Sequence, residues 1–162
     1  MTTISAPAIV TIKQVKDLID ISIGEFIAHD QDYCIDEDDF KSIVLGVNSD
    51  LDLRDYVLGL PIAHDIELVR GWVGFFIQEI AEDDDQRVPF HTIFSALSYE
   101  MNDLVRTNAY LSLGLQKDYP LANLLSRVYS AGWPSGALAT MRAELHPKVI
   151  EALEDKAGQS VI

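Results

Sequence analysis

Apolar residues recur at steps of three and four along almost the whole chain, which is the spacing of one face of an α-helix. In the segment 11–29 they are Ile12, Val15, Leu18, Ile19, Ile23, Phe26 and Ile27. The segments 36–47, 89–101 and 104–116 follow the same period. Strict apolar–polar alternation and hairpin dipeptides of the Asn-Gly or Asp-Gly type are missing. The pattern therefore predicts an all-α protein with no sheet.

Capping residues and prolines divide this pattern into separate helices. Asn48 or Ser49 is expected to cap a short helix that ends near Gly59. Four prolines are each expected in the first turn of a helix: Pro89, Pro120, Pro134 and Pro147. We expect about seven to nine helices, packed as helical hairpins in one domain over residues 1–156. The tail 157–162 is expected to be loose.

The segment 63–82 differs from the others because apolar side chains cover most of its circumference. A helix of this kind usually lies at the centre of its domain, with Trp72 and Phe76 in the core. The alternative is that this helix forms half of a homodimer seam. Gly71 and Gly74 each cost about 1 kcal/mol of helix propensity against alanine, and close approach of another helix would explain them.

The net charge of −14 is distributed unevenly. Residues 1–85 carry 19 acidic and 5 basic residues, whereas residues 86–156 carry 7 of each. A negative field of this kind disfavours direct binding to nucleic acid or to anionic membranes, and it attracts a basic protein surface. The partner expected from the charge is therefore a protein with a basic surface.

Hydrophobic residues make up 48% of the chain, which is enough for a packed core. No apolar run approaches the roughly 20 residues of a spanning helix, and the N-terminal residues lack the pattern of a signal peptide. Cys34, the only cysteine, cannot form a disulfide within the chain. These features favour a cytoplasmic location.

Residues 88–136 show a recurring order of helix-packing residues. An apolar helix and a polar turn precede a helix with small residues such as Ala109, and the step DYPLANLL leads to a helix that ends in AGWP. This segment resembles the C-terminal helical part of an actinobacterial domain-of-unknown-function family, and LDLRDYVLG at 51–59 is similar to an upstream helix of that family. The N-terminal region of the family has no counterpart here. The resemblance implies a helical-hairpin scaffold and an actinobacterial or actinophage origin, and it supplies no activity.

The stretch HDQDYCIDEDDF at 29–40 holds six acids, one histidine and the cysteine. An EF-hand calcium loop that begins at Asp30 would need glycine at its sixth position and glutamate at its twelfth, where Ile35 and Lys41 stand. Asp36 is instead expected to cap the next helix, because aspartate is favoured at that position. We expect a solvated surface here, with no metal and no cofactor.

Two His-Asp dipeptides offer an enzymatic alternative. Metal-dependent phosphohydrolases of the HD type hold a divalent ion with histidine and aspartate ligands, and here these would be His29, His64, Asp65 and Asp118. A phosphate substrate would also need basic residues, and Arg70 is the one base within a helix length of His64. The leading interpretation therefore assigns no catalytic residue.

The expected function is that of a non-enzymatic interaction or regulatory protein. Two acidic runs are the expected contacts for a basic partner: Asp36, Glu37, Asp38 and Asp39, and then Glu82, Asp83, Asp84 and Asp85. If the two runs form one patch, they could imitate the phosphates of nucleic acid, as a phage-type inhibitor does. That inhibitor is a second alternative to the interaction protein.

Overall fold

The computed structural model describes residues 10–161, except for the side chain of Asp30. The expectations for the first nine residues and for Ile162 lie outside this range. The described residues form α1 (Ile12–His29), η1 (Asp30–Asp32), α2 (Glu37–Ser49), α3 (Leu51–Leu58), η2 (Leu60–Ile62), α4 (Ile66–Glu79), η3 (Asp85–Arg87), α5 (Val88–Glu100), α6 (Leu104–Gln116), α7 (Pro120–Ser130) and α8 (Ser135–Asp155). They contain no strand, which confirms the all-α prediction.

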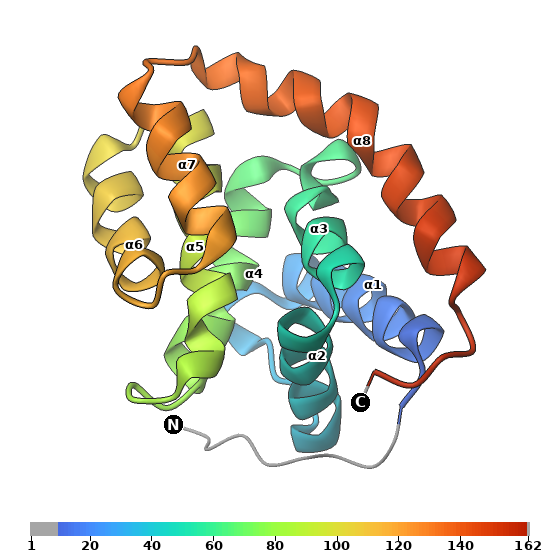
Figure 1. Cartoon of the computed structure of the whole chain (residues 1–162). Helices are drawn as coiled ribbons and strands as arrows, with labels where there is room; N and C mark the ends of the chain where they lie inside the picture. The colour runs from blue at the N-terminus through green and yellow to red at the C-terminus, as the bar shows by residue number, and fades with distance from the viewer. Residues whose placement is uncertain (1–9, 162) are drawn as a thin grey trace.

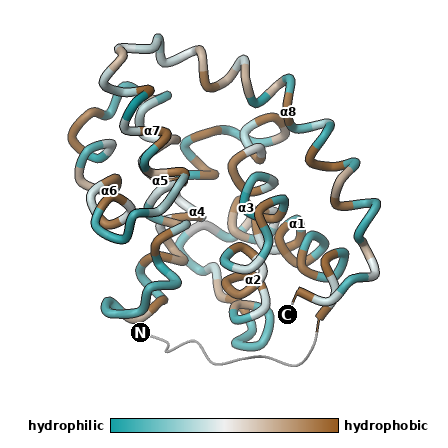
Figure 2. Tube along the Cα trace, in the orientation of Figure 1, coloured by the Kyte–Doolittle hydropathy of each residue, from teal (hydrophilic) through white to brown (hydrophobic). Residues whose placement is uncertain are grey.

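The helices are arranged as a compact body with one long arch along its edge (Figure 1). Helices α1 to α5 make the body, and α6 and α7 lie together on the far side of α5. Helix α8 leaves the end of α7 and runs along the edge of the molecule toward α1 (Figure 1). Hydrophobic and hydrophilic stretches alternate along the helices, as expected of helices that bury one face (Figure 2).

Helix α4 lies at the centre of the main core. The side chains of Trp72 and Phe76 have no exposed surface, and the Phe76 ring stacks between the rings of Phe40 and Phe90, with centroids 5.0 and 5.4 Å away. The central position predicted for this helix is therefore confirmed. Because both side chains are fully buried, a homodimer through this helix would have to rest on its exposed edge around Leu68.

The two glycines of α4 give aromatic rings room to pack. A Cβ atom at Gly71 would lie 3.3 Å from the ring of Phe26, and one at Gly74 would lie 3.3 Å from the ring of Phe94. Both contacts are tighter than ordinary van der Waals packing. The cost in helix propensity is thus offset by close packing against α1 and α5.

Aspartate side chains cap four helices by accepting backbone N–H groups: Asp36, Asp50, Asp65 and Asp103. The cap of α3 corrects one prediction, because it is Asp50 and not Asn48 or Ser49. The reason is that α2 continues through both of those residues. The Asn48 amide instead donates to the carbonyl of Gln86 in η3, 3.1 Å away.

Helix α8 corrects a second prediction, since Pro147 lies inside one continuous helix and does not open a new one. Proline in a helix interior removes one backbone hydrogen bond and usually kinks the helix, at a cost of about 3 kcal/mol. Here the helix continues through the proline, and contacts on both sides anchor its two halves to the body. Arg142 is bonded to α3 and α5 before the proline, and Leu153 is buried in the main core after it.

The end of the chain corrects a third prediction, because the tail expected to be loose is fixed as far as Val161. The amides of Ile12 and Lys13, in the first turn of α1, donate to the carbonyls of Gln159 and Ala157, at 2.9 and 3.0 Å. The first N–H groups of a helix have no partner within the helix, so these carbonyls supply what α1 lacks. The Val161 side chain is 6% exposed and joins the core.

Among residues 10–161, none of the helices combines the length and the apolar character that a span requires.

Candidate binding surfaces

The first acidic run caps α2 as predicted. One carboxylate oxygen of Asp36 accepts the N–H groups of Asp38 and Asp39, at 3.1 and 3.4 Å. Glu37 is paired with Lys41 at 3.0 Å, one helical turn away. In the described part of the chain, no basic side chain pairs with Asp38 or Asp39.

These unpaired carboxylates lie close enough together to affect one another. Partial burial raises the pKa of Asp39, and the negative charges of Asp36, Asp38 and Glu25 raise it further. Both causes disfavour the charged form of Asp39. A cation from another molecule would relieve this repulsion, so the local electrostatics favour a basic ligand.

The same carboxylates form the rim of a groove between α1 and α2. The groove has a volume of about 370 Å³, and its lining includes Gln14, Asp17, Leu18, Ile21 and Ser42 together with Asp38 and Asp39. Ile21 is 58% exposed, which is high for a large apolar side chain. The groove thus combines apolar side chains with carboxylates, and an apolar side chain next to a basic one would fit it.

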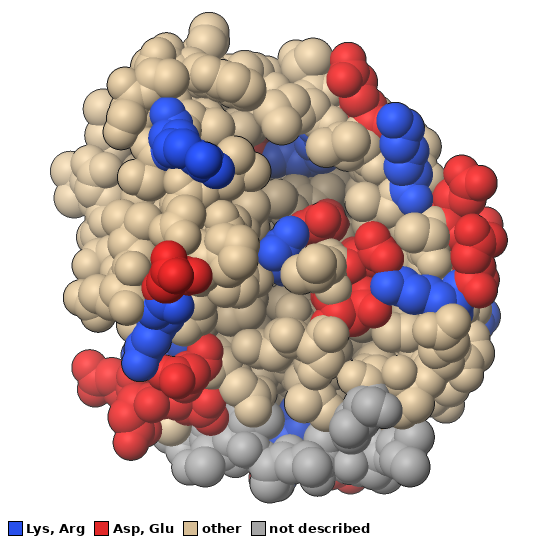
Figure 3. Space-filling view, in the orientation of Figure 1, with Lys and Arg blue, Asp and Glu red and all other residues tan. Residues whose placement is uncertain are grey.

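The second acidic run has structural partners of its own. Asp84 caps η3 by accepting the N–H of Gln86 at 2.9 Å. Asp85 pairs at 3.0 Å with Lys117, which follows the last residue of α6. Figure 3 shows acidic side chains gathered over the turn between α4 and α5. Two of the four acids in this run are therefore already engaged.

The two runs lie at opposite ends of α2. The Gln86 carbonyl contacts Asn48 in the last turn of α2, whereas Asp36 caps its first turn. Twelve residues of helix separate these positions by about 18 Å along the axis. The runs are two patches, so the nucleic-acid-mimic alternative, which needed one continuous patch, lacks support from their geometry.

The four residues of the HD-type alternative do not form a site. Asp65 caps α4 by accepting the N–H of Glu67 at 2.9 Å, and Asp118 accepts from Asn123 at 2.8 Å. Over residues 10–161, no three His, Cys, Asp or Glu side chains are grouped so that they could hold a metal ion. His29 and His64 therefore lack the common site that the phosphohydrolase interpretation requires.

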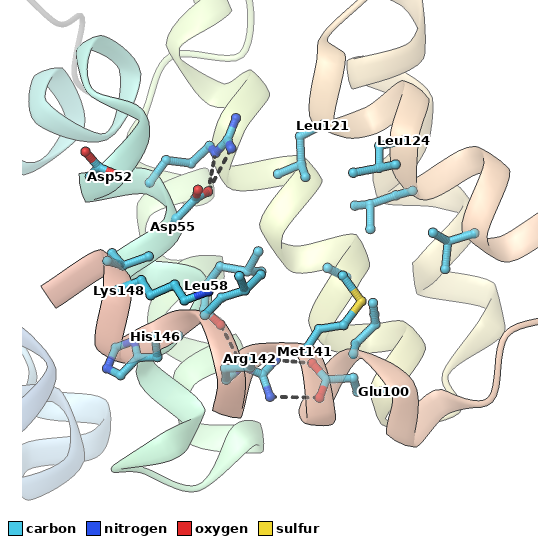
Figure 4. Close-up of a pocket in the computed structure, with 18 residues that line it drawn as sticks. Asp52, Asp55, Leu58, Glu100, Leu121, Leu124, Met141, Arg142, His146 and Lys148 are labelled. Atoms are coloured by element: carbon cyan, nitrogen blue, oxygen red, sulfur yellow. Dashed lines mark hydrogen bonds and ion pairs between the residues drawn. The ribbon is translucent and has the colours of Figure 1, made fainter. Parts of the chain in front are cut away.

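A second concave site, an apolar pocket of about 360 Å³, lies between α3, α5, α7 and α8 (Figure 4). Its apolar lining residues are Leu58, Ala96, Leu121, Leu124, Leu125, Val128, Leu138, Met141, Leu145 and Val149. Figure 3 shows the molecule hollowed beneath the arch of α8. Leu145 is 49% exposed, and Leu124 and Met141 are also exposed. The pocket therefore presents apolar surface to solvent.

A buried ion pair holds α8 in place beside this pocket. Arg142 donates to both carboxylate oxygens of Glu100 on α5, and its Nε donates to the carbonyl of Leu58 on α3 at 2.9 Å (Figure 4). The two charged side chains are 9% and 6% exposed. Bidentate pairs of this kind fix geometry. Helix α7, which supplies the facing wall, packs on α5 and α6.

The remaining charges around the pocket are paired, with one exception. Arg54 pairs with Asp55 at 2.7 Å, and Asp52 pairs with Lys156 at 2.6 Å. Lys148 is exposed and has no carboxylate within salt-bridge distance among the residues described. In Figure 4 its side chain extends from α8 toward Leu58, another residue of the lining.

Sequence reasoning missed this pocket. A local signal was present within 135–155, where four apolar lining residues follow each other at steps of three and four: Leu138, Met141, Leu145 and Val149. The expected helix start at Pro147 divided that stripe between two helices and hid it.

Comparison with known proteins adds no relative. No protein-family model, no curated protein and no solved structure matches this chain. The resemblance of residues 88–136 to an actinobacterial family therefore stays a hypothesis.

Proposed function

We propose that this is a cytoplasmic interaction protein, and that the groove between α1 and α2 binds a basic segment of another protein. The observation that carries the proposal is that Asp38 and Asp39 line the same groove as exposed Ile21, and that no basic side chain among residues 10–161 pairs with either carboxylate. Exposed Cys34 is compatible with a reducing compartment. We also propose an actinobacterial or actinophage origin, on the basis of the resemblance of residues 88–136.

The two kinds of side chain have different roles in this proposal. The carboxylates attract a basic partner and speed the encounter, an effect that is strongest at low salt. Burial of Ile21 and Leu18 against an apolar side chain of the partner slows dissociation. The segment that best suits the groove is therefore one in which Lys or Arg stands beside an apolar residue.

Selection from a displayed random-peptide library tests the proposal without a known partner. The expected result is enrichment of peptides that place Lys or Arg next to an apolar residue. The double variant Asp38→Asn/Asp39→Asn should lose this enrichment. The matched control is Glu151→Gln/Glu154→Gln, which removes the same amount of charge from exposed positions on α8. This control should still enrich the basic peptides.

Association rates of an enriched peptide, measured across a salt series, complete the test. The Asp38→Asn/Asp39→Asn deficit should shrink toward physiological salt, where the Debye length is about 8 Å. Ile21→Ser should speed dissociation and leave the salt dependence unchanged. Selection of acidic peptides, or equal rates for both charge variants at low salt, contradicts the proposal.

A further inference from the structure

The pocket between α3, α5, α7 and α8 is a second site, independent of the acidic groove. Its volume of about 360 Å³ lies within the range of small-molecule sites. Ten apolar residues line it, with Leu124, Met141 and Leu145 exposed around it. Such a surface gains free energy when it is covered by an apolar group, because that area leaves water.

The charges around the pocket define the polar part of its ligand. Arg142 is satisfied by Glu100 and by the Leu58 carbonyl, so this guanidinium supports the pocket wall and is not free to bind an anion. Arg54 and Asp52 are likewise paired. After these pairs are formed, Lys148 is the one cation of the lining that pairs with no carboxylate within residues 10–161.

The histidine of the lining does not add a second cation at neutral pH. His146 stacks on the ring of Tyr56, with the centroids 5.5 Å apart. Burial lowers its pKa, and the positive charges of Arg142 and Lys16 lower it further. Lys148 is therefore the group that an anion would meet at this site.

We propose that this pocket binds a small amphiphile with an apolar body and one anionic group, of which a medium-chain carboxylate is the simplest example. The chain would lie along Leu124, Met141 and Leu145, and the carboxylate would pair with Lys148. A partner helix with a basic face suits the site less well, because the lining charge that stays unpaired within the described part of the chain, that of Lys148, is positive. This proposal does not depend on the acidic groove.

Titration with dodecanoate, below the concentration at which it forms micelles, tests the proposal by calorimetry. The expected result is one bound molecule per chain. Dodecanol, which has the same chain without the charge, should bind more weakly by up to about fivefold, because it lacks the ion pair with the exposed Lys148. Dodecyltrimethylammonium should bind no more tightly than dodecanol.

Two substitutions assign the two parts of the ligand. Lys148→Met should weaken dodecanoate to the level of dodecanol and leave dodecanol unchanged. Leu145→Ser should weaken both ligands. The matched controls are Lys13→Met and Leu104→Ser, at exposed positions on α1 and α6, and neither should change binding. Circular dichroism of each variant shows whether the helices are retained.

Three outcomes overturn the proposal. Several dodecanoate molecules per chain, with no effect of Leu145→Ser, would mean non-specific adsorption. Equal binding of dodecanoate and dodecanol, or an unchanged affinity in Lys148→Met, would remove the role of the charge. Binding of an amphipathic helical peptide at this pocket while dodecanoate is refused would assign the site to a protein partner.

Discussion

Arg142 on α8 and Glu100 on α5 form a two-pronged ion pair that is almost completely removed from solvent. Loss of one partner leaves the other charge buried and unpaired, which costs about 3–5 kcal/mol. Glu100→Ala should therefore lower the free energy of unfolding by that amount in urea titrations. Asp17→Ala, which breaks the exposed pair with Lys13, is the control and should cost about 0–1 kcal/mol.

Replacement of both partners should be far milder than loss of one. The double variant Glu100→Leu/Arg142→Met removes both charges and fills the space with apolar groups, which is often neutral for stability. Urea titration should place this variant closer to wild type than Glu100→Ala. The reverse order would mean that the pair stabilises the fold by more than the cost of its desolvation.

The core prediction concerns Phe76, whose ring is fully buried between Phe40 and Phe90. Phe76→Ala should cost about 3–5 kcal/mol, because it removes apolar contacts and leaves a cavity. Leu68→Ala, on the exposed edge of the same helix, should cost much less. Analytical ultracentrifugation should give the same mass for both variants and wild type. A change of mass without loss of stability would point to a dimer seam.

Substitutions at Asp36, the cap of α2, distinguish the hydrogen bonds that this side chain accepts from the effect of its charge. Asp36 accepts two N–H groups, so Asp36→Ala should cost about 1 kcal/mol of unfolding free energy. Asp36→Asn keeps an acceptor and should cost only a fraction of that amount. Glu37→Ala, which removes a neighbouring acid that is not the cap, is the control. Thermal melts of the three variants at equal salt make the comparison.

The pH prediction concerns His91, whose two ring nitrogens are buried and have no hydrogen-bond partner among the residues that the structure describes. Burial lowers its pKa to about 4, and the positive charge of Arg87 contributes. Because the unfolded chain takes up the proton near pH 6.5 and the folded chain does not, stability is lost as pH falls from 6.5 toward 4. His91→Phe should therefore show a smaller fall in Tm between about pH 7 and about pH 5.

The control for this prediction is His29→Gln, at an exposed histidine. Between about pH 7 and about pH 5, the Tm of this variant should fall by as much as that of wild type. Asp103 does not disturb the comparison. Hydrogen bonds from Arg106 and Arg70 lower its pKa to about 2, so its contribution is lost only below about pH 3.8. An equal fall in Tm for wild type and His91→Phe would contradict the assignment.

Divalent metals provide the last prediction. Calcium, magnesium, manganese and zinc should leave Tm nearly unchanged, because His29, His64, Asp65 and Asp118 do not form a common site. A bound ion at a hundredfold excess over Kd would add about 2.7 kcal/mol, which a thermal melt detects easily. A large shift with manganese that disappears in His64→Ala and in Asp65→Asn would restore the phosphohydrolase alternative. Asparagine is chosen because Asp65 caps α4.

Local patterns in the sequence predicted the parts of the fold that depend on one segment at a time. The wide apolar arc around Trp72 placed α4 at the centre, and the acids after Asp36 marked the start of α2, because both effects act within a few residues. Pro147 misled the prediction, since contacts of α8 with other helices outweigh the local cost of the proline.

The binding surfaces could be predicted less well, because they are assembled from distant segments. The pocket combines Leu58, Glu100, Leu124 and Arg142 from four helices, and the apolar stripe of α8 indicates only one of its walls. The acidic runs were visible as composition, but their separation along α2 depends on the contact of Asn48 with η3. Charge alone carries no information about such distances.

The hydrogen bonds from the start of α1 to the tail have a consequence during protein synthesis. The amides of Ile12 and Lys13 donate to the carbonyls of Gln159 and Ala157, which the ribosome adds about 145 residues later. At about 5–20 residues per second, the ribosome needs on the order of ten seconds to span that interval. During this time the first turn of α1 lacks the two hydrogen bonds that the tail later supplies. The start of α1 in the nascent chain therefore depends on other helices, or on chaperones, until residues 157–159 leave the exit tunnel.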